Sequence, residues 1–289
     1  LPTAEFGGTW IALERGLFKQ QGLDVKILNG GPNASPDTVV MSRKALVGMA
    51  NADAVAQARK NEATLKVIGA LFQKSSFCVV SRADNPIKSP QDMIGKKIGV
   101  AAQNQTAWNI LLKVNNIDPG QINVVPVQFD PSPVANKEVD GQVVYYINEP
   151  TQLEIKGVKT ATMLFDDFGY HILSDVYFAT ERSIKEDADT LVKFLTAQRQ
   201  GWQQLFAEPD VGAELAVNKY GKDQGLDLGQ QKLQSGKIKD LCITPDSPQP
   251  ISLPAKAMQQ TINTLKVAGI DTTVEELFDT SIISKVGSA

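Results

Sequence analysis

The chain has 289 residues, with 29 lysines and arginines against 32 aspartates and glutamates, and a formal net charge of −3. Its 42% hydrophobic and 21% charged residues are those of a folded globular protein, and its length favours two lobes over a single core. The acidic balance without a basic block argues against nucleic-acid binding. No apolar run approaches the ~18 residues of a membrane-spanning helix.

Histidine and cysteine are scarce: one histidine, His171, and two distant cysteines, Cys78 and Cys242. This scarcity argues against hydrolytic triads, histidine zinc sites and Cys-x-x-Cys redox or iron–sulfur sites. We therefore expect no catalytic residue, no metal and no cofactor. For the two cysteines, a disulfide and a pair of buried thiols both remain open, because sequence does not give the distance between them.

Apolar periodicity and turn residues predict alternating strands and helices over the first 180 residues, followed by a mostly helical remainder. The predicted helices lie at 9–18, from 35 onward, and at 54–61, 107–115 and 189–206. The predicted strands lie at 23–28, 46–49, 66–80, 97–100, 124–129, 143–147 and 177–180, with a turn at 30–33.

This order predicts an α/β protein of two lobes, each a mostly parallel sheet flanked by helices. We expect residues 1–78 and 181–289 to form lobe 1 and residues 79–180 to form lobe 2. The two crossings near 78–81 and 180–182 would allow hinge closure around a ligand in a cleft between the lobes.

Ligands of open α/β sheets bind beyond the carboxyl ends of strands, which directs attention to six loops. These loops cover residues 5–10, 51–53, 72–76, 101–108, 145–150 and 165–170. No dinucleotide, P-loop or nucleophile-elbow motif occurs in the chain. A glycoside-cleaving carboxylate pair is conceivable, but sequence does not show its spacing.

Several segments together resemble the ABC-transporter solute-binding proteins that are similar to thiamine-pyrimidine synthase, a type II periplasmic-binding-protein fold. The similar segments are FGGTWIA (6–12), ERGLF (14–18), GLDV (22–25), FQKS (72–75), IKSPQD (87–92), GKKIGV (95–100), VDG (139–141), YINE (146–149) and FL-x-A (194–197) with GW (201–202). That family includes binders of thiamine precursors, riboflavin, alkanesulfonates and nitrate.

The resemblance implies a receptor that captures a solute and delivers it to a membrane-bound ABC permease. It also implies a monomer in the periplasm or outside the cell, with or without a lipid anchor. The enzyme branch of the family needs a cysteine-rich iron motif and an active-site histidine, neither of which this chain has. A family member usually has a full strand before the position of Leu1, so we expect the sequence to be trimmed or processed there. A pyrimidine synthase, a carboxylate-based hydrolase and a sensor or scaffold without a transport role are the rival functions.

The charge of the loops favours one class of solute. They contain one base, Lys74, together with the carboxylates Glu149, Asp166 and Asp167 and several aromatic residues. Carboxylates accept N–H hydrogen bonds and aromatic faces stack on planar rings, so we expect an aminopyrimidine-type thiamine precursor, with riboflavin-like rings next and a sulfonate or nitrate after them.

Nine residues are the candidate ligand-binding residues. Trp10, Trp108 and Tyr146 would stack or form walls, Glu149 and Asp166 would accept from ring amino groups, and Asn51, Gln73, Ser75 and Asn104 would be polar anchors. The alternative is that Glu149 only caps the turn at Pro150 and that the aromatic residues belong to the core.

Overall fold

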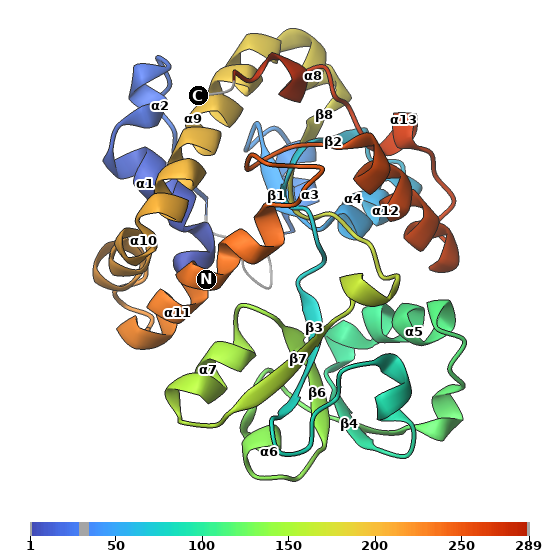
Figure 1. Ribbon diagram of the computed structural model, residues 1–289. Helices are drawn as coiled ribbons and strands as arrows, with labels where there is room; N and C mark the ends of the chain where they lie inside the picture. Colours follow the sequence, from blue (N-terminus) through green and yellow to red (C-terminus); the bar gives the residue numbers. More distant parts are fainter. Residues whose placement is uncertain (1, 29–34, 288–289) are drawn as a thin grey trace. The chain divides into compact units, whose positions relative to one another are not determined.

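In the computed structural model, residues 2–28 and 35–287 are described, and they form two compact units, each with its own sheet (Figure 1). Unit 1 comprises Leu1–Lys74, Ile172–Leu265 and Ile270–Ala289, and unit 2 comprises Ser75–His171 and Lys266–Gly269. The division lies a few residues before the expected first crossing and nine residues before the expected second one. As a result, the strand that ends at Thr180 belongs to unit 1, because it pairs with the other strands of that unit.

The sheet of unit 1 has the order β1-β8-β2, with β1 at Gly48–Ala50, β8 at Ser174–Thr180 and β2 at Leu65–Phe72. Both pairings are antiparallel. The α/β class is confirmed, but the expectation of a mostly parallel sheet is wrong here. The reason is that β8 inserts between β1 and β2 when the chain returns from unit 2, and apolar patterning does not encode strand direction.

Helices make up most of the rest of unit 1. They are α1 (Gly7–Glu14), α2 (Leu17–Gln20), α3 (Pro36–Met41), α4 (Ala52–Lys60), α8 (Glu181–Glu186), α9 (Ala188–Ala207), α10 (Pro209–Leu215), α11 (Leu228–Cys242), α12 (Ala255–Val267) and α13 (Val274–Leu277), with the short turns η1 (Ala4–Phe6), η6 (Ala216–Tyr220) and η7 (Ile283–Lys285). The predicted helix at 9–18 divides into α1 and α2 because Gly16 adopts a left-handed conformation with φ +67°.

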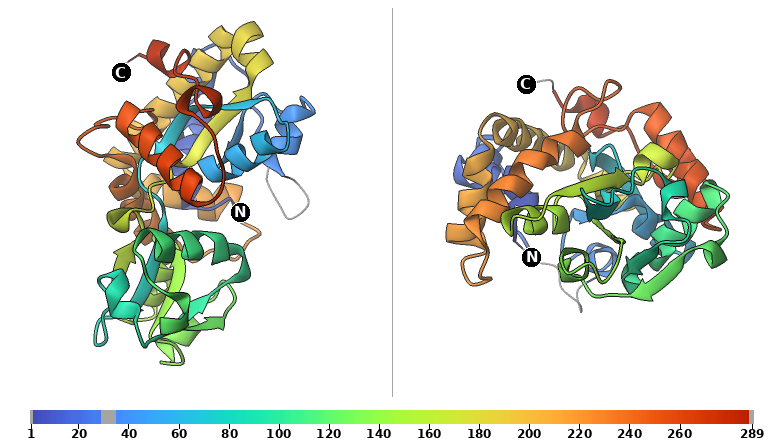
Figure 2. Two further views of the ribbon diagram at one scale, coloured as in Figure 1. Left: turned by 90° about the vertical axis from the view of Figure 1, so that its right-hand side faces the viewer. Right: turned by 60° about the horizontal axis from the view of Figure 1, so that its bottom comes forward.

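Glycines allow α1 to pack very closely against α9 (Figures 1 and 2). A Cβ atom at Gly201 would overlap the carbonyl oxygen of Gly8, and one at Gly8 would overlap the Trp202 ring. The glycines of the FGGTWIA and GW motifs therefore have a packing role in this fold.

The sheet of unit 2 has the order β5-β4-β6-β3-β7. Its strands are β3 (Phe77–Arg82), β4 (Lys97–Val100), β5 (Asn123–Pro126), β6 (Gly141–Tyr145) and β7 (Thr160–Leu164). Strand β4 pairs in parallel with β5 and β6, whereas β3 pairs antiparallel with β6 and β7. The sheet is therefore mixed, and only its β5-β4-β6 part matches the expected parallel pairing.

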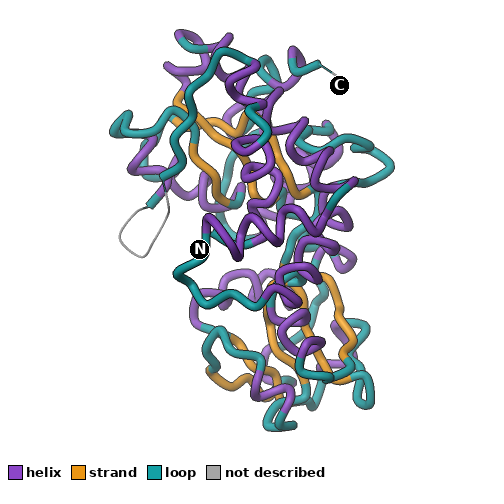
Figure 3. The backbone as a smooth tube through the Cα atoms, turned by 90° about the vertical axis from the view of Figure 1, so that its left-hand side faces the viewer, coloured by secondary structure: helices purple, strands orange, loops and turns teal. Residues whose placement is uncertain are grey.

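Helices and short turns connect these strands, and Figure 3 shows helices beside the strands of each unit. In unit 2 they are α5 (Gln105–Val114), α6 (Ser132–Ala135), α7 (Glu149–Ile155), η2 (Pro90–Met93), η3 (Ala102–Asn104), η4 (Pro119–Gln121) and η5 (Asp166–Phe168).

Some local predictions differ from the structure. Residues 23–28 form no strand, the strand predicted at 66–80 divides into β2 and β3, and β7 was not predicted. The turn predicted at 30–33 lies outside the described residues. Cys78 and Cys242 are both buried thiols. No helix within the described ranges is long and apolar enough to span a membrane.

The helix contact at Gly201 gives a stability prediction. We expect Gly201→Ala to lower the free energy of unfolding by about 2 kcal/mol or more, because the added methyl group would force α1 and α9 apart. Gly236→Ala in α11 is the matched control, since a Cβ there meets nothing within 4 Å, and it should raise stability by about 0.5–1 kcal/mol. Urea unfolding of both variants measures the difference. Equal stability of Gly201→Ala and wild type would contradict the close contact.

Candidate functional site

Polar residues gather at one edge of the unit 2 sheet. This edge contains the carboxyl ends of β4, β6 and β7 and the start of β3, because β3 runs opposite to β6 and β7 with Phe77 paired to Tyr145 and Cys78 to Leu164. The residues that follow or precede these strand ends are called the unit 2 edge: Ser75, Asn104, Tyr145, Tyr146, Glu149 and Asp166. This is the position at which open α/β sheets bind ligands.

Glu149 is the most buried carboxylate of the unit 2 edge, with 4% of its surface exposed. Its Oε2 accepts a hydrogen bond from the Tyr145 backbone N–H at 3.0 Å, and the carboxylate also accepts from the backbone N–H of Glu149 itself. Burial raises the pKa of Glu149 above its usual value, although these N–H groups act in the opposite direction. An ionised carboxylate has about four acceptor positions, so these backbone donors leave capacity for a further N–H group.

The two adjacent tyrosines have different surroundings. Tyr145 is half-buried and its ring stacks on Phe77, with ring centroids 4.8 Å apart. Tyr146, which the sequence analysis chose, packs against the apolar cluster of Cys78, Val144 and Leu153. Tyr145, which was not among the predicted site residues, is the one whose backbone N–H bonds Glu149.

Asp166 and Ser75 come together because the start of β3 pairs with the end of β7. Asp166 Oδ1 accepts the Ser75 backbone N–H at 3.2 Å and lies 3.4 Å from Nδ1 of His171. The Ser75 hydroxyl is fully buried and accepts the Phe77 N–H at 3.3 Å. Both side chains thus contribute to the local structure of this edge.

Asn104 and Trp108 lie in the interior of unit 2. Asn104 is 1% exposed and its Nδ2 donates to the Val143 carbonyl at 3.2 Å, which ties the end of β4 to β6. Trp108 is 1% exposed and faces the core from α5. A tryptophan near a loop and one on the apolar face of a helix look alike in the sequence, which explains why it was selected.

Trp10 is likewise buried, in unit 1. It is 3% exposed, its indole N–H donates to the Thr3 carbonyl at 3.0 Å, and its ring stacks on Tyr220 with centroids 4.2 Å apart. Its ring is therefore committed to internal packing in this structure.

The edge of the unit 1 sheet at the ends of β1 and β2 and the start of β8 is called the unit 1 edge, and it contains Asn51, Gln73 and Asp175. Asn51 Oδ1 accepts the Asp175 backbone N–H at 3.3 Å. Gln73 Nε2 donates to the carbonyls of Ala70 at 2.9 Å and Ser252 at 3.4 Å. Asp175 was not among the predicted site residues; the signal that could have identified it is the polar pair Ser174-Asp175 at the start of a largely apolar strand.

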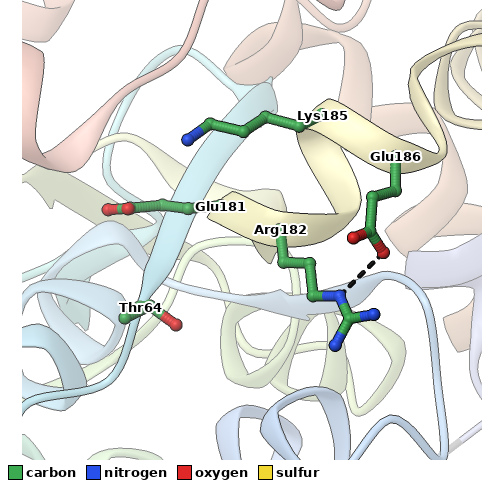
Figure 4. Close-up of a pocket in the computed structure, with 5 residues that line it drawn as sticks. All are labelled: Thr64, Glu181, Arg182, Lys185 and Glu186. Atoms are coloured by element: carbon green, nitrogen blue, oxygen red, sulfur yellow. Dashed lines mark hydrogen bonds and ion pairs between the residues drawn. The ribbon is translucent and has the colours of Figure 1, made fainter.

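A charged surface pocket lies at the opposite end of the same sheet. It has a volume of about 340 Å³ and is lined by Thr64, Glu181, Arg182, Lys185 and Glu186 (Figure 4). Thr64 precedes β2 and Glu181 follows β8, so this pocket is distinct from the unit 1 edge. Within the described part of the chain, no group of three or more His, Cys, Asp or Glu residues is arranged to hold a metal ion.

Comparison with protein families gives a match to the model described as "NMT1/THI5 like" over residues 3–211. Two curated relatives are the riboflavin-binding protein RibY of Chloroflexus aurantiacus and a formylaminopyrimidine-binding protein of Halalkalibacterium halodurans. RibY is 21% identical over 80% of this chain and 68% of its own length. The second is 22% identical over 72% of this chain and 65% of its own length. The chain thus spans about two thirds of the length of these relatives.

Solved structures show the same fold. The periplasmic aliphatic sulphonate binding protein SsuA of Escherichia coli superposes with a TM-score of 0.70 at 14% identity, covering 91% of this chain and 88% of SsuA. The desulfurization enzyme DSZB superposes with a TM-score of 0.64 at 12% identity, covering 99% and 96% of the two chains. The family match confirms the resemblance drawn from the sequence motifs, and these superpositions confirm the periplasmic-binding-protein type of fold.

The raised pKa of Glu149 predicts how stability depends on pH. The folded state binds the proton of this carboxyl more tightly than the unfolded state, so wild type loses stability as the pH rises from about 4 through the raised pKa. Glu149→Gln retains an oxygen for the Tyr145 N–H and does not ionise. We expect its melting temperature to exceed that of wild type at pH 7 and the gap to close near pH 4.

Thermal unfolding from pH 3.5 to 8 in the absence of solute measures this gap. Glu154→Gln, an exposed position in the same helix, is the control and should show no such pH-dependent gap. A Glu149→Gln variant that is less stable than wild type at pH 7 would show that the ionised carboxylate stabilises the fold.

Proposed function

Because the chain belongs to the NMT1/THI5-like family, we propose that it is a non-catalytic receptor that captures a small solute outside the cytoplasmic membrane for an ABC importer. Relatives named for binding riboflavin and formylaminopyrimidine support this function. The chain has one histidine and two widely separated cysteines, so it lacks the metal motif of the enzyme branch of the family. This also supports the receptor function.

We propose further that the solute is a planar heterocycle with N–H groups, of the aminopyrimidine type. The observation that carries this proposal is the arrangement of Glu149 and Tyr145: a buried carboxylate with spare acceptor capacity is bonded to the backbone N–H of Tyr145, whose half-buried ring stacks on Phe77. The carboxylate can accept a hydrogen bond from a ring amino group, and the tyrosine ring can stack on the heterocycle. A tetrahedral or trigonal anion offers neither an N–H donor nor an aromatic face. Trp10 and Trp108 have no part in this proposal, because both are packed in the interior.

Isothermal calorimetry with formylaminopyrimidine, riboflavin, taurine and nitrate tests the class of solute. We expect the aminopyrimidine to bind most tightly and to be recovered unchanged after incubation. Binding of taurine or nitrate alone would overturn the proposed solute class, and conversion of any of these compounds would overturn the receptor function in favour of an enzyme. As an independent readout, a solute at 100 times its Kd should stabilise the native state by about 2.7 kcal/mol.

Glu149→Gln should weaken the binding of formylaminopyrimidine by at least about 10-fold. A hydrogen bond to a charged group contributes about 1.5–3 kcal/mol, and the glutamine oxygen is an uncharged acceptor. Glu154→Gln again serves as the control. Its affinity should stay within about 2-fold of wild type, because a charge at an exposed position contributes little. Calorimetry at pH 8 favours the ionised form of the wild-type carboxylate, whose pKa is raised by burial. Equal affinity of Glu149→Gln and wild type would contradict the acceptor role.

Replacement of each neighbouring tyrosine distinguishes a stacking surface from a core residue. Tyr145→Leu should reduce affinity about 2- to 10-fold through the lost ring contact, while its backbone N–H still holds Glu149. Tyr146→Leu should lower the melting temperature instead and leave affinity nearly unchanged, because Tyr146 packs on an apolar cluster. The reverse pattern would assign the stacking role to Tyr146, as the sequence analysis had it.

A further inference from the structure

Two buried acceptor oxygens at the unit 1 edge have no hydrogen-bond partner. They are Oδ2 of Asp175 and Oε1 of Gln73. Gln73 as a whole is 8% exposed, and both of its hydrogen bonds to carbonyls use its Nε2 atom. A buried polar atom without a partner costs free energy, so it points to a donor that the folded chain does not itself supply.

The pairing of the strands places the two residues at the same edge. Phe72 pairs with Ser174 and Ala70 with Val176 in this antiparallel ladder, so Asp175 is the second residue of β8 and Gln73 directly follows the last residue of β2. Both also adjoin the end of α11: the Gln73 backbone N–H donates to the Leu241 carbonyl at 2.8 Å, and the charge of Asp175 acts on the thiol of Cys242.

The backbone at Asp175 is strained. Its φ is +46°, in the left-handed region that side chains other than glycine rarely adopt. The Asn51 side chain accepts the Asp175 backbone N–H and fixes this conformation. Strain of this kind, retained at a residue with an unsatisfied carboxylate, is characteristic of functional sites.

The groups around Asp175 do not offer a donor for its carboxylate. The Tyr177 hydroxyl donates to Gln198 Oε1 at 3.3 Å and accepts from the Trp202 indole N–H at 3.1 Å, so its proton is already used. Burial raises the pKa of Asp175, and the negative charge of Glu5 raises it further. Both effects disfavour an uncompensated negative charge on Asp175, so a cation or an N–H donor at this carboxylate is favourable and an anion is not.

We propose that Asp175, together with Gln73, forms a second recognition site in unit 1 that accepts hydrogen bonds from an amino or ammonium group of the solute. This inference rests on the proposed receptor function and assigns a residue that the sequence motifs do not contain. An amino group supplies the N–H donors that these acceptor oxygens lack, whereas sulfonate and nitrate oxygens only accept.

Asp175→Asn tests the site with little change to the backbone, because asparagine tolerates a positive φ as aspartate does. The probes are two matched pairs: 4-amino-5-hydroxymethyl-2-methylpyrimidine and the same pyrimidine without its amino group, and taurine with ethanesulfonate. By calorimetry, the substitution should weaken the amino-bearing member of a pair that binds by at least about 10-fold and change its amino-free partner less than about 2-fold.

Two further variants keep the result interpretable. Asp223→Asn removes one negative charge from an exposed position of unit 1 and should leave all affinities unchanged. Gln73→Met removes the other unpartnered oxygen and should produce the same selective loss, which covers the case that Asp175→Asn does not fold.

The outcomes separate this inference from the proposed function. Selective loss of taurine binding, with neither pyrimidine bound by wild type, would support the amino site and overturn the planar solute. Pyrimidine binding by wild type with unchanged affinities in Asp175→Asn, or with equal loss for both members of a pair, would overturn the amino site alone. Absence of binding by all four probes would overturn both.

Discussion

A buried acceptor oxygen requires a hydrogen-bond donor, and this requirement governs the polar edges of both sheets. In unit 2 the backbone N–H groups of Tyr145 and Ser75 satisfy part of the capacity of Glu149 and Asp166. In unit 1, Asp175 Oδ2 and Gln73 Oε1 remain unsatisfied within their own unit. The fold thus holds in place acceptors that its own donors leave partly or wholly unsatisfied.

This distribution of acceptors accounts for the preferred class of solute. Each unit presents carboxylate and amide oxygens at the strand ends where α/β proteins bind ligands, and the carboxylates of Glu149 and Asp175 both bear pKa values raised by burial. Burial disfavours the ionised form of these carboxylates, and a ligand that donates hydrogen bonds or brings positive charge stabilises that form. A planar ring with amino groups supplies such donors together with a face for Tyr145.

The sequence was informative wherever local chemistry decides the structure. Strand β4 was predicted with its observed ends, the Pro36 helix begins where its turn residues indicated, and Glu149 was found because it follows an apolar strand. Strand direction depends on long connections, so the antiparallel insertion of β8 was not predictable and Asp175 at its start was missed. Trp10 and Trp108 were selected because a ring that packs inward from a helix has the same local sequence as one that faces a ligand.

The glycine motifs illustrate the same limit from the other direction. Gly7 and Gly8 look like a loop that allows close approach to a ligand, but in the structure they allow α1 to approach α9 and α10.

Native mass spectrometry of the gently purified protein, followed by release and identification of any small molecule carried with it, tests the central claim most directly. The account predicts a single planar compound with ring nitrogen and N–H groups; an aliphatic sulfonate or nitrate as the carried compound would contradict it.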